Sequence, residues 1–458
     1  MKLLSRLAVN LTVISVLAVP ALSQNPVVDW NNTAVKTIVS TASTAGITPT
    51  SGMTGIYLAY VHLAIFDTLN AIHPSFRAYG GIQPYAAPDS SEAAAVATAA
   101  HDVLLNYFPA AGGSLDATYE TYLANLTDGI EAKNDGVAVG RAVAAALIAQ
   151  RLGDGVNGVC AYAQGSGPGV YQSSPCMYTY GSGVGVYGKT PPAFLPAQTP
   201  WIASMTPFTM TSSSQFRPVQ GPTPLDSGEW IDDYNRTRIW GSLTNSPRTE
   251  EQTTIGLFWT PNPGPPFSSM LKNLVTDHAL NLLQSARLYA MVWTGFADAF
   301  IGCMDGKYHY SFWRPVTAIH AGGGNPELTA DPGWTALAVT PNHPEYPAAH
   351  GCGTGALSAL VAAYFGTTEV PLSVTATYAV PAALGGGSIT ATRTYAGTKD
   401  LLLEVEAARI YGGMHYQHSV VQGAVLGKKV ARQLRHEFFR PLDGEDSQDA
   451  EDDDRDFR

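Results

Sequence analysis

The sequence predicts a mainly α-helical protein, and three observations support this fold class. The chain has 458 residues, of which 45% are hydrophobic, so it can bury a sizeable core. Apolar residues recur at helical spacing over several long stretches. Strand and helix patterns do not alternate, and no repeat of roughly 20–50 residues is evident. These patterns favour helices bundled around a buried site over an α/β sheet.

Eight stretches carry the helical pattern most clearly. The predicted helices cover residues 56–72, 93–107, 136–152, 249–258, 270–302, 351–365, 400–411 and 415–438. Between them, residues 153–227 are rich in Gly, Pro, Ser, Tyr and Thr and have no sustained period, which predicts a long ordered loop region that covers the core or lines an entrance. Residues 366–398 are predicted to be rich in turns.

The two ends of the chain differ in composition from the rest. Lys2 and Arg6 precede an apolar run over 7–19, and Ala21-Leu22-Ser23 fits a cleavage site, so residues 1–23 are predicted to be a signal peptide. Residues 443–458 hold nine acids and two bases and are predicted to form a disordered acidic tail. Residues 24–442 are then one secreted, extracellular catalytic domain, with no membrane span in the mature form. The net charge of -11 argues against a nucleic-acid partner.

Export is compatible with glycosylation and disulfides. Three sequons begin at Asn31, Asn125 and Asn235 and indicate a glycoprotein. Cys160 and Cys176 bracket part of the loop region, and a disulfide between them is predicted. For Cys303 and Cys352 two alternatives stay open: they pair with each other, or they are buried free thiols.

Two basic side chains lie seven residues apart in the aromatic segment 307–315. On a helix, that spacing places Lys307 and Arg314 on one face. Arginine offers a planar fork for tetrahedral oxyanions, and lysine offers a point charge. The pair therefore predicts an oxyanion-binding face; the alternative is a surface pair lying over aromatic rings. Asp305 is a candidate partner for a site cation, and Asp298 a candidate for orienting the site.

A proline-rich segment leads into the next predicted helix. Pro344 and Pro347 keep the approach extended, and the helix begins at or just after His350. Free N–H groups at a helix N-terminus bind anions, and a histidine there can act as acid or base. Because Ala348 and Ala349 are small, the backbone can approach a ligand closely. The alternative is a buried histidine with a structural hydrogen bond.

Arg409 ends one predicted helix and His415 opens the next. On a continuous helix, residues six apart point about 120° apart. Gly412 and Gly413 break the helix, so both side chains can converge on one ligand. The alternative is a helix-end arginine and a capping histidine that share no ligand. His418, one turn later, is expected to support this histidine or to be exposed.

In this order, the three segments resemble the signature of the vanadium-dependent haloperoxidases and the related type 2 phosphatidic acid phosphatases. That signature reads Lys-x6-Arg-Pro, then Pro-Ser-Gly-His, then Ser-Arg-x5-His. The residues that match it are Lys307, Arg314, Pro315, Pro347, His350, Arg409 and His415. The positions that depart from it hold alanine in place of serine or glycine and are Ala348, Ala349 and Ala408. The resemblance implies helical bundles of the vanadium haloperoxidase type.

The resemblance also implies a role for each residue. His415 would bind the vanadium axially, and His350 would be the acid–base residue. The groups that would hold the vanadate oxygens are Lys307, Arg314, Arg409 and the main chain at Ala348 and Ala349, with the Ala349 N–H replacing that of the family's glycine. The three cations would draw charge from the oxyanion and activate hydrogen peroxide for attack by a halide.

The departures from the signature bear on activity and halide choice. Ala348 removes a hydroxyl that would bond the oxyanion, and such a bond to a charged group contributes about 1.5–3 kcal/mol. Ala349 adds a methyl close to the ligand. Both changes are expected to weaken vanadate binding or slow turnover. Seven residues before the acid–base histidine, the fungal chloroperoxidases carry Phe and the algal bromoperoxidases His, so His343 favours bromide or iodide.

The sequence therefore predicts a vanadate-dependent haloperoxidase, an oxidoreductase whose partners are hydrogen peroxide and a halide or a small organic substrate. Phosphate would compete for the vanadate site. The alternative is a secreted acid phosphatase, in which His415 forms a phosphohistidine and His350 protonates the leaving group. A third alternative is a haloperoxidase-like enzyme recruited to a biosynthetic step, or a non-catalytic secreted protein. A homo-oligomer is compatible with all of these.

Overall fold

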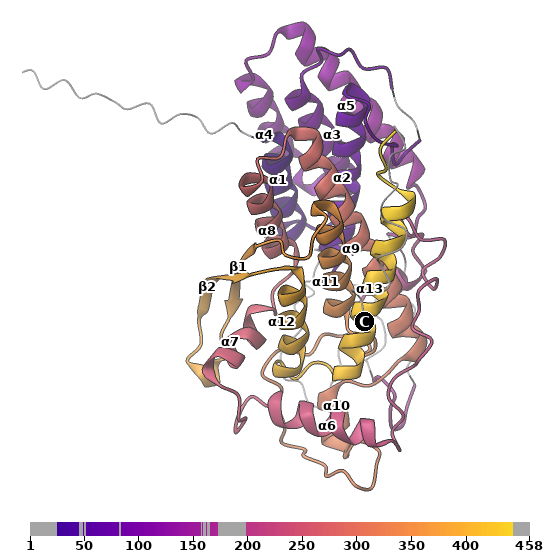
Figure 1. Ribbon diagram of the computed structural model, residues 1–458, viewed down its shortest axis with the longest axis vertical. Helices are drawn as coiled ribbons and strands as arrows, with labels where there is room; N and C mark the ends of the chain where they lie inside the picture. The colour runs from indigo at the N-terminus through magenta and orange to yellow at the C-terminus, as the bar shows by residue number, and fades with distance from the viewer. Residues whose placement is uncertain are drawn as a thin grey trace, which may run out of the picture.

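The computed structural model describes residues 25–44, 49, 52–81, 84–156, 158, 162, 165–172 and 198–442. The chain is mainly helical, as the sequence predicts (Figure 1). The predicted signal peptide, the pair Cys160 and Cys176, and the acidic tail lie outside the described residues. The sequon at Asn31 is described, and this side chain is fully buried, so the structure argues against glycosylation there.

The described residues form α-helices, short 3-10 turns and two strands. In chain order, the helices are α1 (Pro26–Ser40), α2 (Met53–Ile72), α3 (Glu92–Tyr107), α4 (Gly112–Asn125), α5 (Ile130–Gln150), α6 (Gly228–Trp240), α7 (Glu250–Phe258), α8 (Gly264–Asp277), α9 (Leu282–Tyr310), α10 (Pro315–Ala321), α11 (Ala349–Phe365), α12 (Thr398–Tyr411) and α13 (Gln417–Glu437). The 3-10 turns cover Pro109–Ala111, Pro200–Ser204 and Ala382–Leu384, and the strands are β1 (Leu372–Ala379) and β2 (Ser388–Tyr395).

The predicted continuous helix over 270–302 is wrong, because the structure has two helices there. α8 ends at Asp277, and Ala279 takes a left-handed conformation with φ 48°. Asn281 then caps α9: its side chain accepts from the N–H of Gln284 at 2.8 Å, and the Gln284 side chain accepts from the N–H of Asn281 at 3.0 Å. This reciprocal capping box starts a new helix, which runs to Tyr310.

Part of the segment predicted to be turns is a β-hairpin. β1 and β2 pair antiparallel, with Leu372 opposite Tyr395 and Ala379 opposite Ser388. Alternate residues of β1 are buried, and the strand packs against α8 and α7. In Figure 1 the hairpin lies beside α7 and α12 at one side of the molecule.

The core is built around α2, α9, α11 and α13. Every residue of α2 is buried, and this helix packs against α3 and α9. By length and composition, α2 is the one described helix that could span a membrane, but its apolar surface is covered by the protein itself. α9 packs on its other sides against α11, which begins within the second motif, and α13, which follows the third motif.

α11 and α13 approach each other closely because glycines lie at their interface. A Cβ at Gly427 would lie 2.1 Å from the carbonyl oxygen of Cys352, and one at Gly423 would lie 2.5 Å from that of Ala348. From the other side, a Cβ at Gly351 would lie 2.5 Å from the carbonyl oxygen of Val420. This backbone contact fixes the start of α11 relative to the start of α13, which is the arrangement the site needs.

The described part of the loop region packs over the core, as predicted. The buried carboxylate of Asp298 on α9 accepts from the main-chain N–H groups of Phe208, Thr209 and Met210 at 2.6–3.2 Å. Asp298 therefore anchors this loop to α9. The prediction that it orients a residue of the three motifs is wrong.

Candidate functional site

The first motif lies at the junction of α9 and α10. α9 ends at Tyr310, Ser311 is left-handed with φ 48°, and Arg314 is the N-cap of α10. The prediction that Lys307 and Arg314 share one helix face is therefore wrong. The two side chains still converge, because both reach the segment 343–345. Lys307 Nζ donates to two main-chain carbonyls of that segment at 2.9 and 2.8 Å, and Arg314 Nε donates to a third at 2.7 Å.

The second motif begins α11, as predicted. Ala348 is the N-cap, Ala349 is the first helical residue, and His350 lies in the first turn. The first N–H groups of a helix have no acceptor within it, and the small side chains leave the main chain accessible to a ligand. The His350 imidazole lies near the main-chain carbonyl of Trp259.

The third motif spans the turn between α12 and α13. Arg409 lies in the last turn of α12, and His415 precedes α13. Gly413 has φ 70°, and a Cβ there would lie 2.5 Å from the carbonyl oxygen of Gly241, so the turn requires glycine. The predicted helix break therefore exists and redirects the chain between the two site residues.

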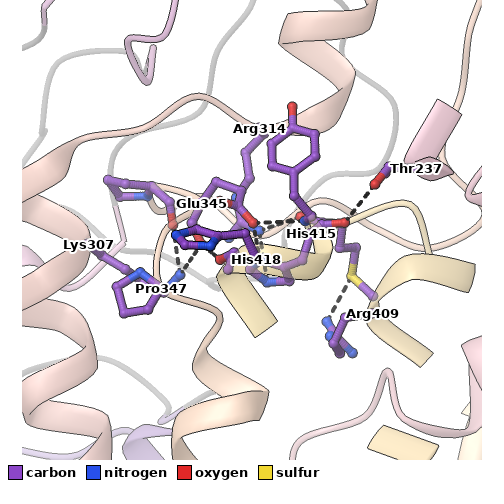
Figure 2. A network of polar contacts seen from close by, with 12 residues as sticks. Thr237, Lys307, Arg314, Glu345, Pro347, Arg409, His415 and His418 are labelled. Atoms are coloured by element: carbon purple, nitrogen blue, oxygen red, sulfur yellow. Dashed lines mark hydrogen bonds and ion pairs between the residues drawn. The ribbon is translucent and has the colours of Figure 1, made fainter. Parts of the chain in front are cut away.

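Contacts from α6 hold His415 and the start of α13 in place. Thr237 Oγ1 donates to the main-chain carbonyl of His415 at 3.1 Å (Figure 2). The Asp233 carboxylate accepts from the N–H groups of Gln417 at 3.1 Å and His418 at 3.3 Å. An acid that accepts from the first N–H groups of a helix stabilises it, so α6 fixes the position of the imidazole.

The structure brings the cations of the first and third motifs and the imidazole of His415 into one buried cluster (Figure 2). Arg314 Nη1 lies 3.2 Å from His415 Nε2 and donates to the main-chain carbonyl of Met414 at 2.9 Å. Arg409 Nη2 lies 3.0 Å from the Met414 sulfur, and Arg409 Nη1 donates to the carbonyl of Trp259 at 2.7 Å. His350 lies near the same carbonyl, and its pKa is lowered first by burial and then by the nearby charge of Arg409.

Glu345 also belongs to this cluster, although the three motifs assign it no role. Its Oε1 accepts from His415 Nδ1 at 2.8 Å and from the N–H of Tyr416 at 3.1 Å. Burial raises the pKa of Glu345 to about 7, against the opposing effect of Lys307 and Arg314. A carboxylate at Nδ1 places the proton of the neutral imidazole there, so the Nε2 lone pair faces Arg314 and the cluster. A signal was available, since Glu345 is an acid between two prolines of the second motif.

Burial sets the protonation of the cluster. The pKa values of His350 and His415 lie well below the usual histidine range, first because of burial and then because of the nearby cations. Both imidazoles are therefore neutral at neutral pH and can accept a proton or bind a Lewis acid. Burial also lowers the pKa of Lys307, Arg314 and Arg409, because a charged group loses hydration in the interior.

The cluster has the charge and the free donors that an oxyanion would satisfy. Within the described part of the chain, Lys307, Arg314 and Arg409 make no ion pair, and Arg409 Nε has no hydrogen-bond partner. Among the described residues, Glu345 is the one acid in contact with the cluster, and its pKa near 7 leaves it partly neutral. Buried cations are costly unless they are paired, so the site fits a multiply charged anion such as vanadate or phosphate.

The ligand-free protein is expected to gain stability and lose oxyanion affinity as the pH rises from about 8 to about 10. Burial lowers the pKa of Lys307 from 10.5 to about 8. In this window the folded chain releases a proton that the unfolded chain still binds, so the free energy of unfolding rises with pH, by up to about 3 kcal/mol. Chemical denaturation and phosphate binding, each measured at both ends of the window, test this. The Lys307→Met variant should lose this contribution to both trends.

His343, the predicted determinant of halide choice, is buried at the edge of the cluster. Its Nδ1 lies 2.9 Å from Arg314 Nη2, and its carbonyl accepts from Arg314 Nε at 2.7 Å. His343 therefore contacts one of the oxyanion-binding cations directly.

Other candidate residues lie outside the cluster. The prediction that Asp305 pairs with a site cation is wrong: it forms a bidentate pair with Arg217 at 2.7 Å. His418 contacts the carbonyl of Gly221 at 3.0 Å and stacks on a tyrosine ring, so it is not directed at Arg314. Of the two alternatives for Cys303 and Cys352, the structure has buried free thiols.

Comparison with known proteins agrees with this fold. Residues 287–444 match the family described as the second helical-bundle domain of VCPO, a range that contains all seven matching motif residues. No curated protein matches the chain significantly.

Solved structures extend the likeness over most of the chain. The first bacterial vanadium-dependent iodoperoxidase superposes with a TM-score of 0.70 at 19% identity, covering 90% of this chain and 97% of that one. A holo-type bacterial vanadium-dependent chloroperoxidase superposes with a TM-score of 0.63 at 17% identity, covering 84% and 91%. Its apo-type counterpart gives 0.63 at 16% identity, covering 84% and 92%. The chain has the vanadium haloperoxidase fold, as the three motifs predicted.

Proposed function

We propose that this chain is a vanadate-dependent haloperoxidase that uses hydrogen peroxide to oxidise a halide to hypohalous acid. The observation that carries the proposal is the buried cluster of Lys307, Arg314 and Arg409, none with an ion-pair partner among the described residues. Arg314 contacts a neutral His415, and the charges of the other two lie near enough to lower its pKa further. Likeness to structures described as a vanadium-dependent iodoperoxidase and chloroperoxidase supports it.

The residues present fit vanadate. His415 Nε2 would hold the vanadium, and the three cations together with the first N–H groups of α11 would hold its oxygens. Bound vanadate supplies a Lewis acid that activates hydrogen peroxide for oxygen transfer without changing its own oxidation state. The three cations stabilise negative charge in a site that excludes water, where such interactions are strong.

His350 is placed to move protons. The imidazole lies in the first turn of α11, near the Trp259 carbonyl and the charge of Arg409. Since the pKa of His350 lies well below its usual range, the imidazole is neutral and can accept the proton of incoming peroxide. The neighbouring charge of Arg409 would then favour return of that proton to a leaving oxygen.

We further propose bromide or iodide as the preferred halide and an exported site of action. The halide proposal depends on His343, which contacts Arg314 and so could influence the charge distribution of the site. The export proposal depends on the N-terminal signal pattern. Initial rates with chloride, bromide and iodide at equal concentration measure the first, and cleavage before Gln24 in the secreted chain measures the second.

Ala348→Ser is expected to raise vanadate affinity about tenfold or more, because a hydroxyl bond to a charged group contributes about 1.5–3 kcal/mol. Ala348 is fully buried at the N-cap of α11, beside the first free N–H groups. Vanadate titration of the apoprotein, followed by calorimetry, measures the change. Ala356→Ser, further along the same helix, is the control and should leave the affinity unchanged. An unchanged affinity in Ala348→Ser would show that position 348 does not face the oxyanion.

The function is tested by reconstitution. Apoprotein free of phosphate is loaded with orthovanadate and assayed for bromination of a phenol-type dye with peroxide, while hydrolysis of nitrophenyl phosphate is followed in parallel without vanadate. Halogenation that depends on vanadate is the expected result. Phosphate hydrolysis without halogenation would overturn the proposal in favour of an acid phosphatase acting through a phosphohistidine at His415, for which the Glu345–His415 pair is equally suited.

A further inference from the structure

The main-chain carbonyl of Trp259 lies beside two residues of different motifs. It accepts from Arg409 Nη1 at 2.7 Å, and the imidazole of His350 lies near it. Trp259 follows α7 as its C-cap and is 3% exposed. The direction of this one carbonyl therefore sets the orientation of a candidate oxyanion-binding cation that lies beside the acid–base histidine.

A carboxylate outside the three motifs fixes the Trp259 side chain. Trp259 Nε1 donates to Glu404 Oε1 at 3.0 Å. Arg393 binds the same carboxylate with two bonds of 2.7 Å, one to each oxygen, and the Tyr395 hydroxyl donates to Oε1 at 2.6 Å. Arg393 also donates to Glu251 at 2.7 Å.

These contacts come from three separate elements. Glu404 lies on α12, five residues before Arg409, while Arg393 and Tyr395 lie on β2, and Trp259 follows α7. Figure 1 shows the hairpin against α7 and α12. A bidentate arginine–carboxylate pair has a fixed geometry, so it holds the indole in one orientation, and the indole holds its own main chain.

We propose that Glu404, held by Arg393 of the hairpin, is a positioning residue that acts on Arg409 through Trp259. The proposal rests on the proposed oxyanion function of the site. It gives the β-hairpin, which lies outside all three motifs, a part in building that site. Residues that hold a ligand-binding group in place typically change affinity without touching the ligand.

The test is Glu404→Gln in full-length apoprotein, with calorimetric binding of orthovanadate and, separately, inorganic phosphate. We expect about three- to thirtyfold weaker binding. The sign is informative: removing a negative charge near an anion site would strengthen anion binding if long-range Coulomb attraction were the only effect. Weaker binding therefore indicates lost positioning.

Two further variants separate positioning from charge and from folding. Glu251→Gln removes the same charge from the other partner of Arg393, but this carboxylate is 62% exposed and does not touch Trp259, so binding should stay unchanged. Trp259→Phe deletes the indole N–H without altering charge and should weaken binding as Glu404→Gln does. Melting temperatures of all variants show whether they fold.

A double-variant cycle with Arg409→Met decides the route of the effect. If Glu404 acts through Arg409, Glu404→Gln should weaken oxyanion binding much less in the Arg409→Met background. Full additivity, or unchanged binding in folded Glu404→Gln and Trp259→Phe, would overturn the positioning role of Glu404 and leave the proposed oxyanion site standing. If wild type binds neither anion, or Arg409→Met binds as wild type does, the proposed oxyanion site itself fails.

Discussion

Replacing His415 with alanine is expected to abolish halide oxidation and to lower orthovanadate affinity by at least about 100-fold, because changes even to the partners of a metal ligand cost about 10- to 100-fold. The imidazole is 1% exposed, and its Nε2 lies 3.2 Å from Arg314 in the cation cluster. No other imidazole in the described cluster replaces it, since His350 belongs to the first turn of α11 and His343 contacts Arg314 from the segment before that helix.

The prediction for His415 depends on which ring nitrogen carries the proton. Glu345 Oε1 accepts at Nδ1 at 2.8 Å, so Nε2 keeps its lone pair for the ligand. Alanine at 415 would also leave the buried Glu345 carboxylate with the N–H of Tyr416 as its remaining close donor, and some loss of stability is expected. Vanadate calorimetry, peroxidase rates and thermal melts on the same preparation separate the two effects.

His418→Ala is the matched control for this experiment. His418 is three residues further along the chain, and its imidazole contacts the carbonyl of Gly221 at 3.0 Å and not the cation cluster. Its removal should leave vanadate affinity and turnover within about twofold of wild type, the range expected of a substitution away from the site. Retention of full activity by His415→Ala would show that the site is assigned wrongly.

The sequence predicted which residues of the motifs converge, but it predicted only part of the backbone geometry that brings them together. Arg409 and His415 converge through a glycine turn, as their spacing with Gly412 and Gly413 indicated. Lys307 and Arg314 also meet, but not on one helix, because Ser311 ends α9. Their convergence depends on contacts with the main chain at 343–345. Helical periodicity is a local pattern and does not predict such a long-range contact.

Other features were present in the sequence as weak local signals. Leu372, Val374, Ala376 and Tyr378 alternate with smaller or polar residues, which is a strand pattern, but the glycines that follow favoured turns. Glu345 is a single acid in an apolar segment, and its role as partner of His415 depends on a contact seventy residues away. The contacts that link Arg393, Glu404 and Trp259 join three elements that are far apart in the sequence, so they could not be predicted from a local pattern.

Arg409→Met is expected to change oxyanion affinity and stability in opposite directions. Arg409 is 1% exposed, has no ion-pair partner among the described residues, and leaves Nε without an acceptor. Its charge is disfavoured in this place, because burial and the nearby Arg314 charge both lower the pKa of Arg409. Methionine has a similar length and no charge. The free energy of unfolding of the ligand-free variant should therefore exceed that of wild type by about 1–3 kcal/mol, as when buried ionic groups are replaced by apolar ones.

In the same variant, affinity for orthovanadate should fall about 100-fold, since two charge-assisted bonds to the oxyanion would be lost. A saturating ligand raises the melting temperature according to its affinity. Vanadate should therefore raise the melting temperature of wild type strongly and that of Arg409→Met little. Thermal melts with and without vanadate measure both quantities in one series.

Arg151→Met supplies the contrasting buried arginine. Arg151 is 6% exposed, but it pairs with Asp154 at 2.8 Å and donates to two main-chain carbonyls. Its removal leaves a buried carboxylate without its cation, so stability should fall by about 3–5 kcal/mol while vanadate affinity stays unchanged. If Arg409→Met behaves like Arg151→Met, then Arg409 is a structural residue and not a ligand for an oxyanion. The two substitutions are expected to change the free energy of unfolding in opposite directions. Arg151 already pairs with a carboxylate of the fold, whereas the proposed anion of Arg409 is a ligand that must be bound.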